Sequence, residues 1–232
     1  MSVEAISDRL ETLGARDALD EVLRECDGSR ACFTCSFQAE DVAVLNFLRK
    51  RLPQIPVLFL ETGYHFAETY KFRDALAREW KLNLVNVLPE KTVQEQEAEF
   101  GILYRGEPTR CCQLRKVEPL FRALEPYSIW FTGLRREQSP TRKNLKKIER
   151  HRLPSGRELW KVSLLADWTW GQVWEYTAEN KLPYLPQYDA GYPSIGCEPC
   201  TAIPSDPNNP RSGRWGGTKL ECGIHTFSER AS

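Results

Sequence analysis

The sequence predicts an α/β fold built on a mainly parallel sheet flanked by helices. Two observations carry this prediction. First, short apolar runs have the length of buried strands, and they lie at residues 30–37, 56–60, 82–88 and 129–132. Second, segments with helical spacing of their apolar residues lie between these runs. Strands that alternate with helices in this way are typical of a parallel sheet with helices on its faces.

The remaining elements follow from periodicity and from turn residues. Apolar residues recur with the helical period, as Leu19, Val22 and Leu23 do, and they predict helices at residues 6–27, 41–52, 66–80, 93–100, 110–124 and 168–180. Thr109 and Asp167 are the expected N-caps of the last two helices. Residues 101–109 and the basic segment 133–147 read as loops, and residues 147–162 read as a hairpin.

The chain has the length of one ordinary domain, at 232 residues. We expect residues 1–205 to form a single α/β domain. Beyond Lys181 the sequence is rich in Pro and Gly, so loops are expected there. Residues 206–232 are expected to form a flexible C-terminal tail.

The charge balance excludes some classes of partner. Lys and Arg together number 32, as do Asp and Glu, so no overall field attracts nucleic acid or an anionic membrane. No run approaches the length of a membrane span, and no secretory signal is evident at the start of the sequence. We therefore expect a cytoplasmic protein that binds neither nucleic acid nor membrane.

Three segments are expected to meet at one edge of the sheet. They are residues 36–40, 61–65 and 132–142, and each follows a predicted strand. In open parallel sheets, ligands bind outside the carboxyl ends of the strands. The sequence therefore predicts a ligand site where these three segments converge.

Eight cysteines need an explanation in a chain expected in a reducing compartment, where disulfides rarely persist. Cys32 and Cys35 form a Cys-x-x-Cys pair, but they lie in a predicted strand, where a free cysteine behaves as a small apolar core residue. Cys26 is interpreted in the same way. None of these three is expected to bind a metal.

Cys197 and Cys200 are better candidates for a metal site, because Gly196 and Pro199 form a turn that can direct both sulfurs to one centre. The other close pair is Cys111-Cys112. Neighbouring residues on a regular helix point about 100° apart, so two adjacent thiolates reach one centre best at an irregular helix start. A cluster with separate iron corners suits this geometry better than one tetrahedral zinc, although zinc stays open from the residues alone.

Cys222 has no close cysteine partner. His225 lies near it in the sequence, and basic residues precede it, including Arg211, Arg214 and Lys219. A tail thiol near cations is suited to act as a nucleophile, because the thiolate is the attacking form. A spare cysteine in a disordered tail is the equal alternative from these residues. A neighbouring histidine could also help to lower the pKa of the Cys222 thiol.

Four motifs span the chain from Thr34 to Thr226. They are Ser36-Phe37-Gln38-Ala39-Glu40-Asp41, the paired cysteines Cys111-Cys112 with Cys197-Glu198-Pro199-Cys200, Thr132-Gly133-Leu134-Arg135-Arg136-Glu137-Gln138-Ser139, and Glu221-Cys222-Gly223-Ile224-His225. With these four motifs in this order, the chain resembles the assimilatory adenylyl-sulfate reductases. These enzymes form the bacterial [4Fe-4S] branch of the adenylyl-sulfate/phosphoadenylyl-sulfate reductase family.

The resemblance implies an adenine nucleotide α-hydrolase-like fold, related to the PP-loop proteins, whose first loop wraps the nucleotide. It implies one [4Fe-4S] cluster per subunit, adenylyl sulfate as substrate and thioredoxin as reductant, in sulfate assimilation and cysteine biosynthesis. The oligomeric state stays open, a homo-oligomer included. The site residues that it implies are Cys222 for catalysis, Cys111, Cys112, Cys197 and Cys200 for the cluster, and Ser36, Phe37, Leu60, Thr62, Gly63, Lys116, Arg142, Arg211 and Arg214 for the substrate.

The implied reaction begins with attack of Cys222 on the sulfur of adenylyl sulfate, which gives an S-sulfocysteine and AMP; a thioredoxin thiol then frees sulfite. Cations around the phosphosulfate offset the repulsion between two anions. Two alternatives keep the fold but change the chemistry: reduction of 3′-phosphoadenylyl sulfate, and iron–sulfur transfer of sulfur to tRNA. The second needs a nucleic-acid surface, which the neutral charge balance disfavours.

Overall fold

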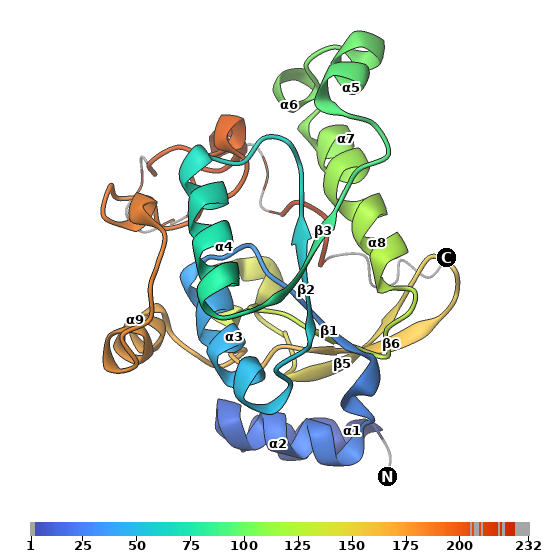
Figure 1. Ribbon diagram of the computed structural model, residues 1–232, viewed down its shortest axis with the longest axis vertical. Coiled ribbons are helices and arrows are strands. Elements are labelled where there is room, and N and C mark those ends of the chain that lie inside the picture. The colour runs from blue at the N-terminus through green and yellow to red at the C-terminus, as the bar shows by residue number, and fades with distance from the viewer. Residues whose placement is uncertain are drawn as a thin grey trace.

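The computed structural model describes residues 3–204, 206, 209, 211–217, 219 and 221–225. Within these residues the strands are β1 Ala31–Thr34, β2 Pro56–Leu60, β3 Asn83–Val87, β4 Ile129–Phe131, β5 Ile148–Arg152 and β6 Glu158–Val162. They form one sheet in the order β3-β2-β1-β4-β6-β5 (Figure 1). Every neighbouring pair is parallel except the β5–β6 hairpin. The predicted α/β fold with a mainly parallel sheet is confirmed.

The helices in the described part of the chain cover both faces of the sheet and one end of it. They are α1 Val3–Glu11, α2 Ala15–Glu25, α3 Ala39–Arg51, α4 Ala67–Glu79, α5 Val93–Phe100, α6 Leu103–Gly106, α7 Pro108–Cys112, α8 Glu118–Leu124 and α9 Trp170–Glu179. Helices α3 and α4 lie on one side of the sheet and α8 on the other, while α5, α6 and α7 project beyond its end, at the top of Figure 1.

Strand residues alternate between two apolar cores, as the two-residue period of a strand requires. On one face, Phe33 and Phe131 pack with residues of α3 and α9. On the other face, Cys32 and Trp130 pack with residues of α8 and, from the C-terminal segment, with Ile224. The second core therefore joins residue 224 to the sheet.

Four local predictions were wrong. The helix expected over residues 6–27 is two helices, α1 and α2, because the chain breaks at Gly14, which precedes α2. The expected loop at residues 101–109 contains α6. Thr109 is not an N-cap, because α7 already begins at Pro108, whose missing N–H suits the first helical position. Thr169, rather than Asp167, caps α9 through a capping box with Gln172.

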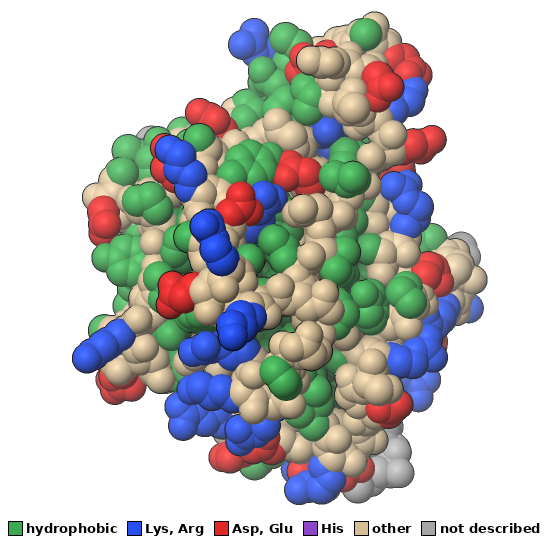
Figure 2. Space-filling model, in the orientation of Figure 1, with side chains coloured by type: hydrophobic (Ala, Val, Ile, Leu, Met, Phe, Trp, Pro, Cys, Tyr) green, Lys and Arg blue, Asp and Glu red, His purple; other side chains and the backbone are tan. Residues whose placement is uncertain are grey.

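The surface agrees with the charge balance of the sequence. Lys and Arg side chains are interspersed with Asp and Glu side chains over much of the face in Figure 2. Among the described residues, no helix is long and apolar enough to cross a bilayer.

The flexible tail expected at residues 206–232 remains a prediction: residues 205, 207, 208, 210, 218, 220 and 226–232 lie outside the described part of the chain.

Candidate active site and cysteine cluster

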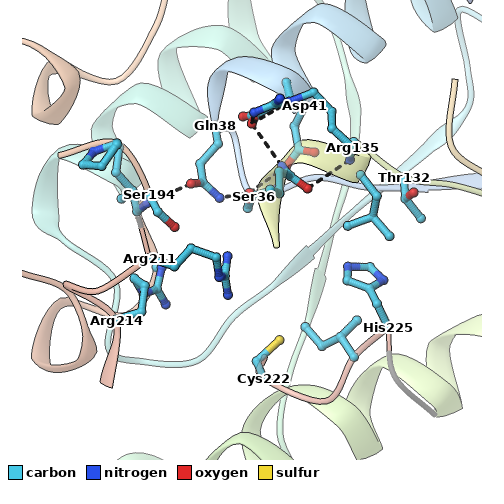
Figure 3. A pocket seen from close by; sticks show the side chains of 18 of the residues that line it. Ser36, Gln38, Asp41, Thr132, Arg135, Ser194, Arg211, Arg214, Cys222 and His225 are labelled. Atoms are coloured by element: carbon cyan, nitrogen blue, oxygen red, sulfur yellow. Dashed lines mark hydrogen bonds and ion pairs between the residues drawn. The ribbon is translucent and has the colours of Figure 1, made fainter. Parts of the chain in front are cut away.

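A cavity of about 760 Å³ opens at the carboxyl ends of the strands. Its walls include the segments after β1, β2 and β4, so the predicted convergence of three loops at one sheet edge is confirmed. The walls also include residues 193–196 and, from the C-terminal segment, Arg211, Arg214, Trp215, Cys222, Ile224 and His225. Figure 3 shows the Cys222 sulfur pointing into the space between the loop at Ser36 and the side chains of Arg211 and Arg214. We call this space the nucleotide cavity below, after the ligand that the resemblance implies.

The loop after β1 is held in a closed turn by Asp41. One carboxylate oxygen of Asp41, Oδ2, accepts hydrogen bonds from the Ser36 amide and the Ser36 hydroxyl, both at 2.6 Å. Burial raises the pKa of Asp41 to about 7, although the hydrogen bonds from Ser36 act in the opposite direction. The floor of the cavity thus carries a carboxyl group that changes charge near neutral pH.

Gln38 ties this loop to the segment that carries Cys197. Its Nε2 donates to the Ser36 hydroxyl at 3.0 Å, and its Oε1 accepts from the Ile195 amide at 2.8 Å. Both contacts lie inside the same wall of the cavity (Figure 3). The position of Ser36 is therefore coupled to the chain that leads into the second cysteine pair.

The predicted substrate-binding residues separate into two groups. The residues that line the nucleotide cavity are Ser36, Leu60, Lys116, Arg142, Arg211 and Arg214. Thr62 and Gly63 do not line it: Thr62 faces the cysteines, and a Cβ on Gly63 would stand 2.5 Å from Cγ2 of Val93. Phe37 is fully buried and packs against Phe59 in a tilted arrangement, with ring centroids 5.8 Å apart.

Phe37 points inward because of its backbone conformation. Its φ of 61° lies in the left-handed region, which is uncommon for a residue with a Cβ. This turn directs the ring into the core, between Phe59 and Phe72, while Ser36 and Gln38 face the cavity. The structure therefore gives Phe37 the position of a core residue, and any contact with a nucleotide would come from its backbone.

The four cysteines predicted as metal ligands lie together. Cys111, Cys112, Cys197 and Cys200 line one small cavity beside the nucleotide cavity, with Lys116 in the walls of both. Two backbone contacts bring the second pair to the end of β2: His65 pairs with Cys197 in an antiparallel bridge, and the Glu198 amide donates to the Tyr64 carbonyl at 2.7 Å. We call these four residues the cysteine cluster.

The backbone after the first cysteine pair is not α-helical. Cys111 and Cys112 end the short helix α7, and residues Gln113–Val117 form a π-helical turn before α8 begins. Single π-turns of this kind are frequent at functional sites, because they change the direction of the side chains that follow. The irregular backbone therefore follows the two cysteines, which are the last residues of α7, instead of lying at a helix start as expected. Lys116 lies within this turn.

Charges in the cysteine cluster are unevenly distributed. Burial raises the pKa of Cys197, but the ammonium group of Lys116, the Thr62 hydroxyl 3.4 Å from the sulfur, and Arg214 outweigh burial and lower it. Burial and the neighbouring cysteines raise the pKa of the Cys111 thiol to about 12. Burial lowers the pKa of Lys116, but nearby sulfurs, that of Cys197 first, outweigh burial and raise it. Lys116 is thus a partly buried cation placed among thiols.

Cys222 lies between this cluster and the second core. It is half-buried, packs against both groups and lines the nucleotide cavity. Arg214, nearby, is buried and donates from Nε to the carbonyl of Cys200 at 3.2 Å. A thiol, an arginine and the nucleotide loop therefore share one cavity, which can bring a sulfur nucleophile to an anionic substrate.

The His225 side chain packs against an aromatic residue of the sheet. Its ring stacks on Trp130, with centroids 5.5 Å and planes 19° apart. Burial, together with the positive charge of Lys161, Arg142 and others, holds the pKa of His225 well below its usual range, so the imidazole is neutral at neutral pH. A neutral ring supplies no positive charge to Cys222, so the suggestion that His225 lowers the pKa of that thiol finds no support here.

Sequence reasoning missed Arg115. Its Nε donates to the carbonyl of Thr62, and its Nη1 donates to Gln96 Oε1 at 3.1 Å. The first of these bonds holds Thr62, whose hydroxyl contacts the Cys197 sulfur, against the π-helical turn that contains Lys116. No motif marks Arg115; its place between Cys112 and Lys116 was the available signal.

Comparisons with known proteins indicate the family of this chain. The family model described as "Phosphoadenosine phosphosulfate reductase domain" matches residues 30–203. An "Adenosine 5'-phosphosulfate reductase" of Geobacillus kaustophilus is 43% identical over 218 residues, 93% of this chain and 91% of that protein. A "Phosphoadenosine 5'-phosphosulfate reductase" of Gloeobacter violaceus is 44% identical over 229 residues, 97% of this chain and 93% of that protein.

A solved structure is similar over most of its length. The phosphoadenylyl-sulfate reductase of Candida auris, in its phosphate complex, superposes with a TM-score of 0.74 at 26% sequence identity, covering 87% of this chain and 98% of that chain. This likeness supports the expected adenine nucleotide α-hydrolase-like fold. The chain therefore belongs to the phosphoadenosine phosphosulfate reductase family, together with the adenosine 5'-phosphosulfate reductases that it matches.

Proposed function

We propose that this protein reduces adenylyl sulfate to sulfite and AMP, with Cys222 as the nucleophile and thioredoxin as the reductant, in sulfate assimilation. The observation that carries the proposal is the shared cavity: Cys222, Arg211 and Arg214 line the same space as the loop of Ser36. The similarity to curated adenosine 5'-phosphosulfate reductases over more than nine-tenths of the chain supports the same substrate.

The first step forms one bond and breaks one. The Cys222 thiolate attacks the sulfur of adenylyl sulfate; a bond between the Cys222 sulfur and the sulfonate forms, and the bond from sulfur to the bridging oxygen breaks. The electron pair of that broken bond leaves with AMP. Arg142, Arg211, Arg214 and Lys116, which all line the cavity, would offset the repulsion between the two anions and the charge that develops on AMP.

The second step returns the enzyme to its starting state. One thioredoxin thiolate attacks the Cys222 sulfur, sulfite departs with the electron pair, and a mixed disulfide forms. The second thioredoxin thiol then releases Cys222 as a thiol and leaves oxidised thioredoxin. The two electrons that reduce the sulfur therefore come from the dithiol of thioredoxin, and no other reductant is needed.

We propose one [4Fe-4S] cluster per subunit, held by Cys111, Cys112, Cys197 and Cys200. Four thiols line one cavity, and Lys116 and Arg214 lie close enough to offset negative charge on them, although no three of the described side chains are grouped as ligands of a single metal ion. Two of the thiols are adjacent in the chain and precede an irregular turn, which suits a cluster with separate iron corners better than one tetrahedral zinc. When bound, the group supplies structural linkage and a local field.

A second substrate, 3′-phosphoadenylyl sulfate, is favoured by one observation: the similar protein of Gloeobacter violaceus carries the name of a reductase for it. The two nucleotides differ in a single phosphate. Comparing kcat/KM for both with the purified protein decides between them, and a higher value for adenylyl sulfate is expected.

The deciding experiment for the proposal is intact-protein mass spectrometry after incubation with adenylyl sulfate in the absence of thiols. We expect a mass gain of one SO₃ group, located on Cys222 by peptide mapping and removed by reduced thioredoxin. A gain on another cysteine would reassign the nucleophile. No gain, with sulfite still produced when thioredoxin is present, would contradict the covalent intermediate.

A further inference from the structure

Glu221, the residue before Cys222, lies in a network that the proposed reaction does not use. Its Oε1 accepts a hydrogen bond from Arg142 Nε at 2.9 Å, and its Oε2 accepts one from Arg142 Nη2 at 2.7 Å. Thr141 Oγ1 donates to Oε1 at 2.9 Å. Arg211 Nη2 lies 3.9 Å from Oε2. The Glu221 side chain is 8% exposed and that of Arg142 is 10% exposed.

The carboxylate lies outside the nucleotide cavity. Arg142, Arg211 and Cys222 all line that cavity, but Glu221 does not. Glu221 thus contacts both arginines without itself lining the cavity. It does not occupy the space that an anionic nucleotide would take.

Glu221 is also unsuited to accept a proton from Cys222. Burial disfavours its ionised form, but the charge and hydrogen bonds of Arg142, and then the charge of Arg211, outweigh burial and hold the pKa of Glu221 below its usual value. A carboxylate stabilised in this way is a weak base. Its two oxygens are moreover occupied by Arg142 and Thr141.

We propose that Glu221 is a positioning residue: its two-point contact with Arg142 fixes the Cys222 segment on the turn at Pro140–Arg142 and directs Arg142 and Arg211 toward the nucleotide. This inference rests on the proposed function, because it assigns a role in the first half of that reaction. Consecutive Cα atoms are about 3.8 Å apart, so a fixed Glu221 leaves Cys222 little freedom. A paired arginine and carboxylate with two parallel hydrogen bonds fixes orientation as well as distance.

The role predicts that a change at Glu221 affects the two half-reactions differently. Attack on adenylyl sulfate needs Cys222 inside the cavity, in line with the leaving oxygen, so it depends on the anchor. Attack by thioredoxin needs the modified Cys222 to be accessible, so it does not depend on the anchor. A residue that only supported the fold would slow both.

The test uses the holoprotein and the variant Glu221→Gln, which keeps the shape but loses the charge and one acceptor. In a rapid-quench single turnover with saturating adenylyl sulfate and no thiol, we expect adduct formation to slow by about 10- to 100-fold, the size of effect that misplacing a reacting group produces. Release of sulfite from a preformed adduct by thioredoxin is expected at the unaltered rate or faster. Iron content should equal that of the unmodified protein.

Two further variants keep the test decisive. Thr141→Val removes one hydrogen bond from an exposed residue and should slow adduct formation only a few-fold. Asp20→Asn is the matched control: Asp20 makes the same two-point contact with Arg51, at 2.6 and 3.0 Å, in an exposed pair of α2 and α3. This control should react at the rate of the unmodified protein.

Adduct formation at an unaltered rate in Glu221→Gln would overturn the inference, as would a weaker affinity for the nucleotide with no loss of rate. Failure of the proposed function is recognised separately, because the unmodified protein would then form no adduct. In that case the rate of Cys222 alkylation by iodoacetamide, followed by peptide mapping, still tests the anchor. Glu221→Gln should alkylate faster at Cys222 than the unmodified protein, and an equal rate would count against the anchor.

Discussion

The guanidinium group of Arg214 lies against the backbone of Gly196, so close that a Cβ on Gly196 would stand 2.0 Å from Nη2 of the arginine. Gly196 directly precedes Cys197, and Arg214 lines the nucleotide cavity. The glycine thus lets one cation reach both the cysteine cluster and the nucleotide cavity. A side chain at this position would force Arg214 to move, because real Cβ contacts are not that short.

We predict that Gly196→Ala lowers kcat/KM by about tenfold or more through displacement of Arg214. Gly106→Ala is its matched control, since a Cβ there meets nothing within 4 Å. Steady-state sulfite production by both variants checks the prediction. Equal activity of the two would show that Arg214 does not need its present position.

Cys222→Ser should abolish sulfite production while iron content and the visible chromophore stay unchanged. The reason is that Cys222 lines the cavity and is half-buried, but is none of the four cysteines that line the smaller one. Iron analysis, absorption spectra and a sulfite assay are the measurements. Retained turnover would refute the assignment of the nucleophile.

Cys197→Ser should lose most of its iron and melt at a temperature lower by about 10 °C or more, because binding of a structural metal centre is coupled to folding. Cys32→Ala is the control. Cys32 is equally a buried cysteine, but it packs in the core beneath α8. The control should keep its iron, and a full iron complement in Cys197→Ser would argue against its role as a ligand.

Binding of adenylyl sulfate should weaken as the pH rises through about 7, the value to which burial raises the pKa of Asp41. The sign follows from charge: below this pH the folded protein holds Asp41 neutral, and above it an ionised carboxylate faces an anionic ligand. We expect a loss of affinity of about tenfold across this range. Calorimetric titration of the Cys222→Ser variant measures it without turnover.

The additional substitution Asp41→Asn should remove this pH dependence. The amide that replaces the carboxyl group would retain an oxygen to accept both hydrogen bonds from Ser36, since a single oxygen of Asp41 accepts both. A flat affinity profile with Asp41 still present would contradict the prediction.

The sequence predicted the sheet well, because each strand is a short apolar run between polar turns. Pro56–Leu60 was predicted to the residue, and the β5–β6 hairpin agrees within one residue. The convergence of three loops followed from the parallel order alone. The motifs likewise predicted that both cysteine pairs and Cys222 lie close together.

Side-chain direction within loops could not be read in the same way. Phe37 belongs to the nucleotide-loop motif, yet its positive φ turns the ring into the core. The π-helical turn at Gln113–Val117 has no sequence signature, because its residues fit an α-helix equally well. Glu221 reads as a surface carboxylate until the fold brings Arg142 to it.

The separation of the two cysteine pairs along the chain has a consequence for biosynthesis. Between Cys112 and Cys197 lie α8, three strands of the sheet and α9. A ribosome that has released only the first pair presents two of the four thiols, so all four are available only after all six described strands of the sheet have been synthesised. Closing so long a loop around one centre is entropically costly unless the intervening strands have already paired. Insertion of iron and sulfide into the proposed cluster would thus be a late event, and a chain that stalls before residue 197 would expose two unpaired thiols open to oxidation.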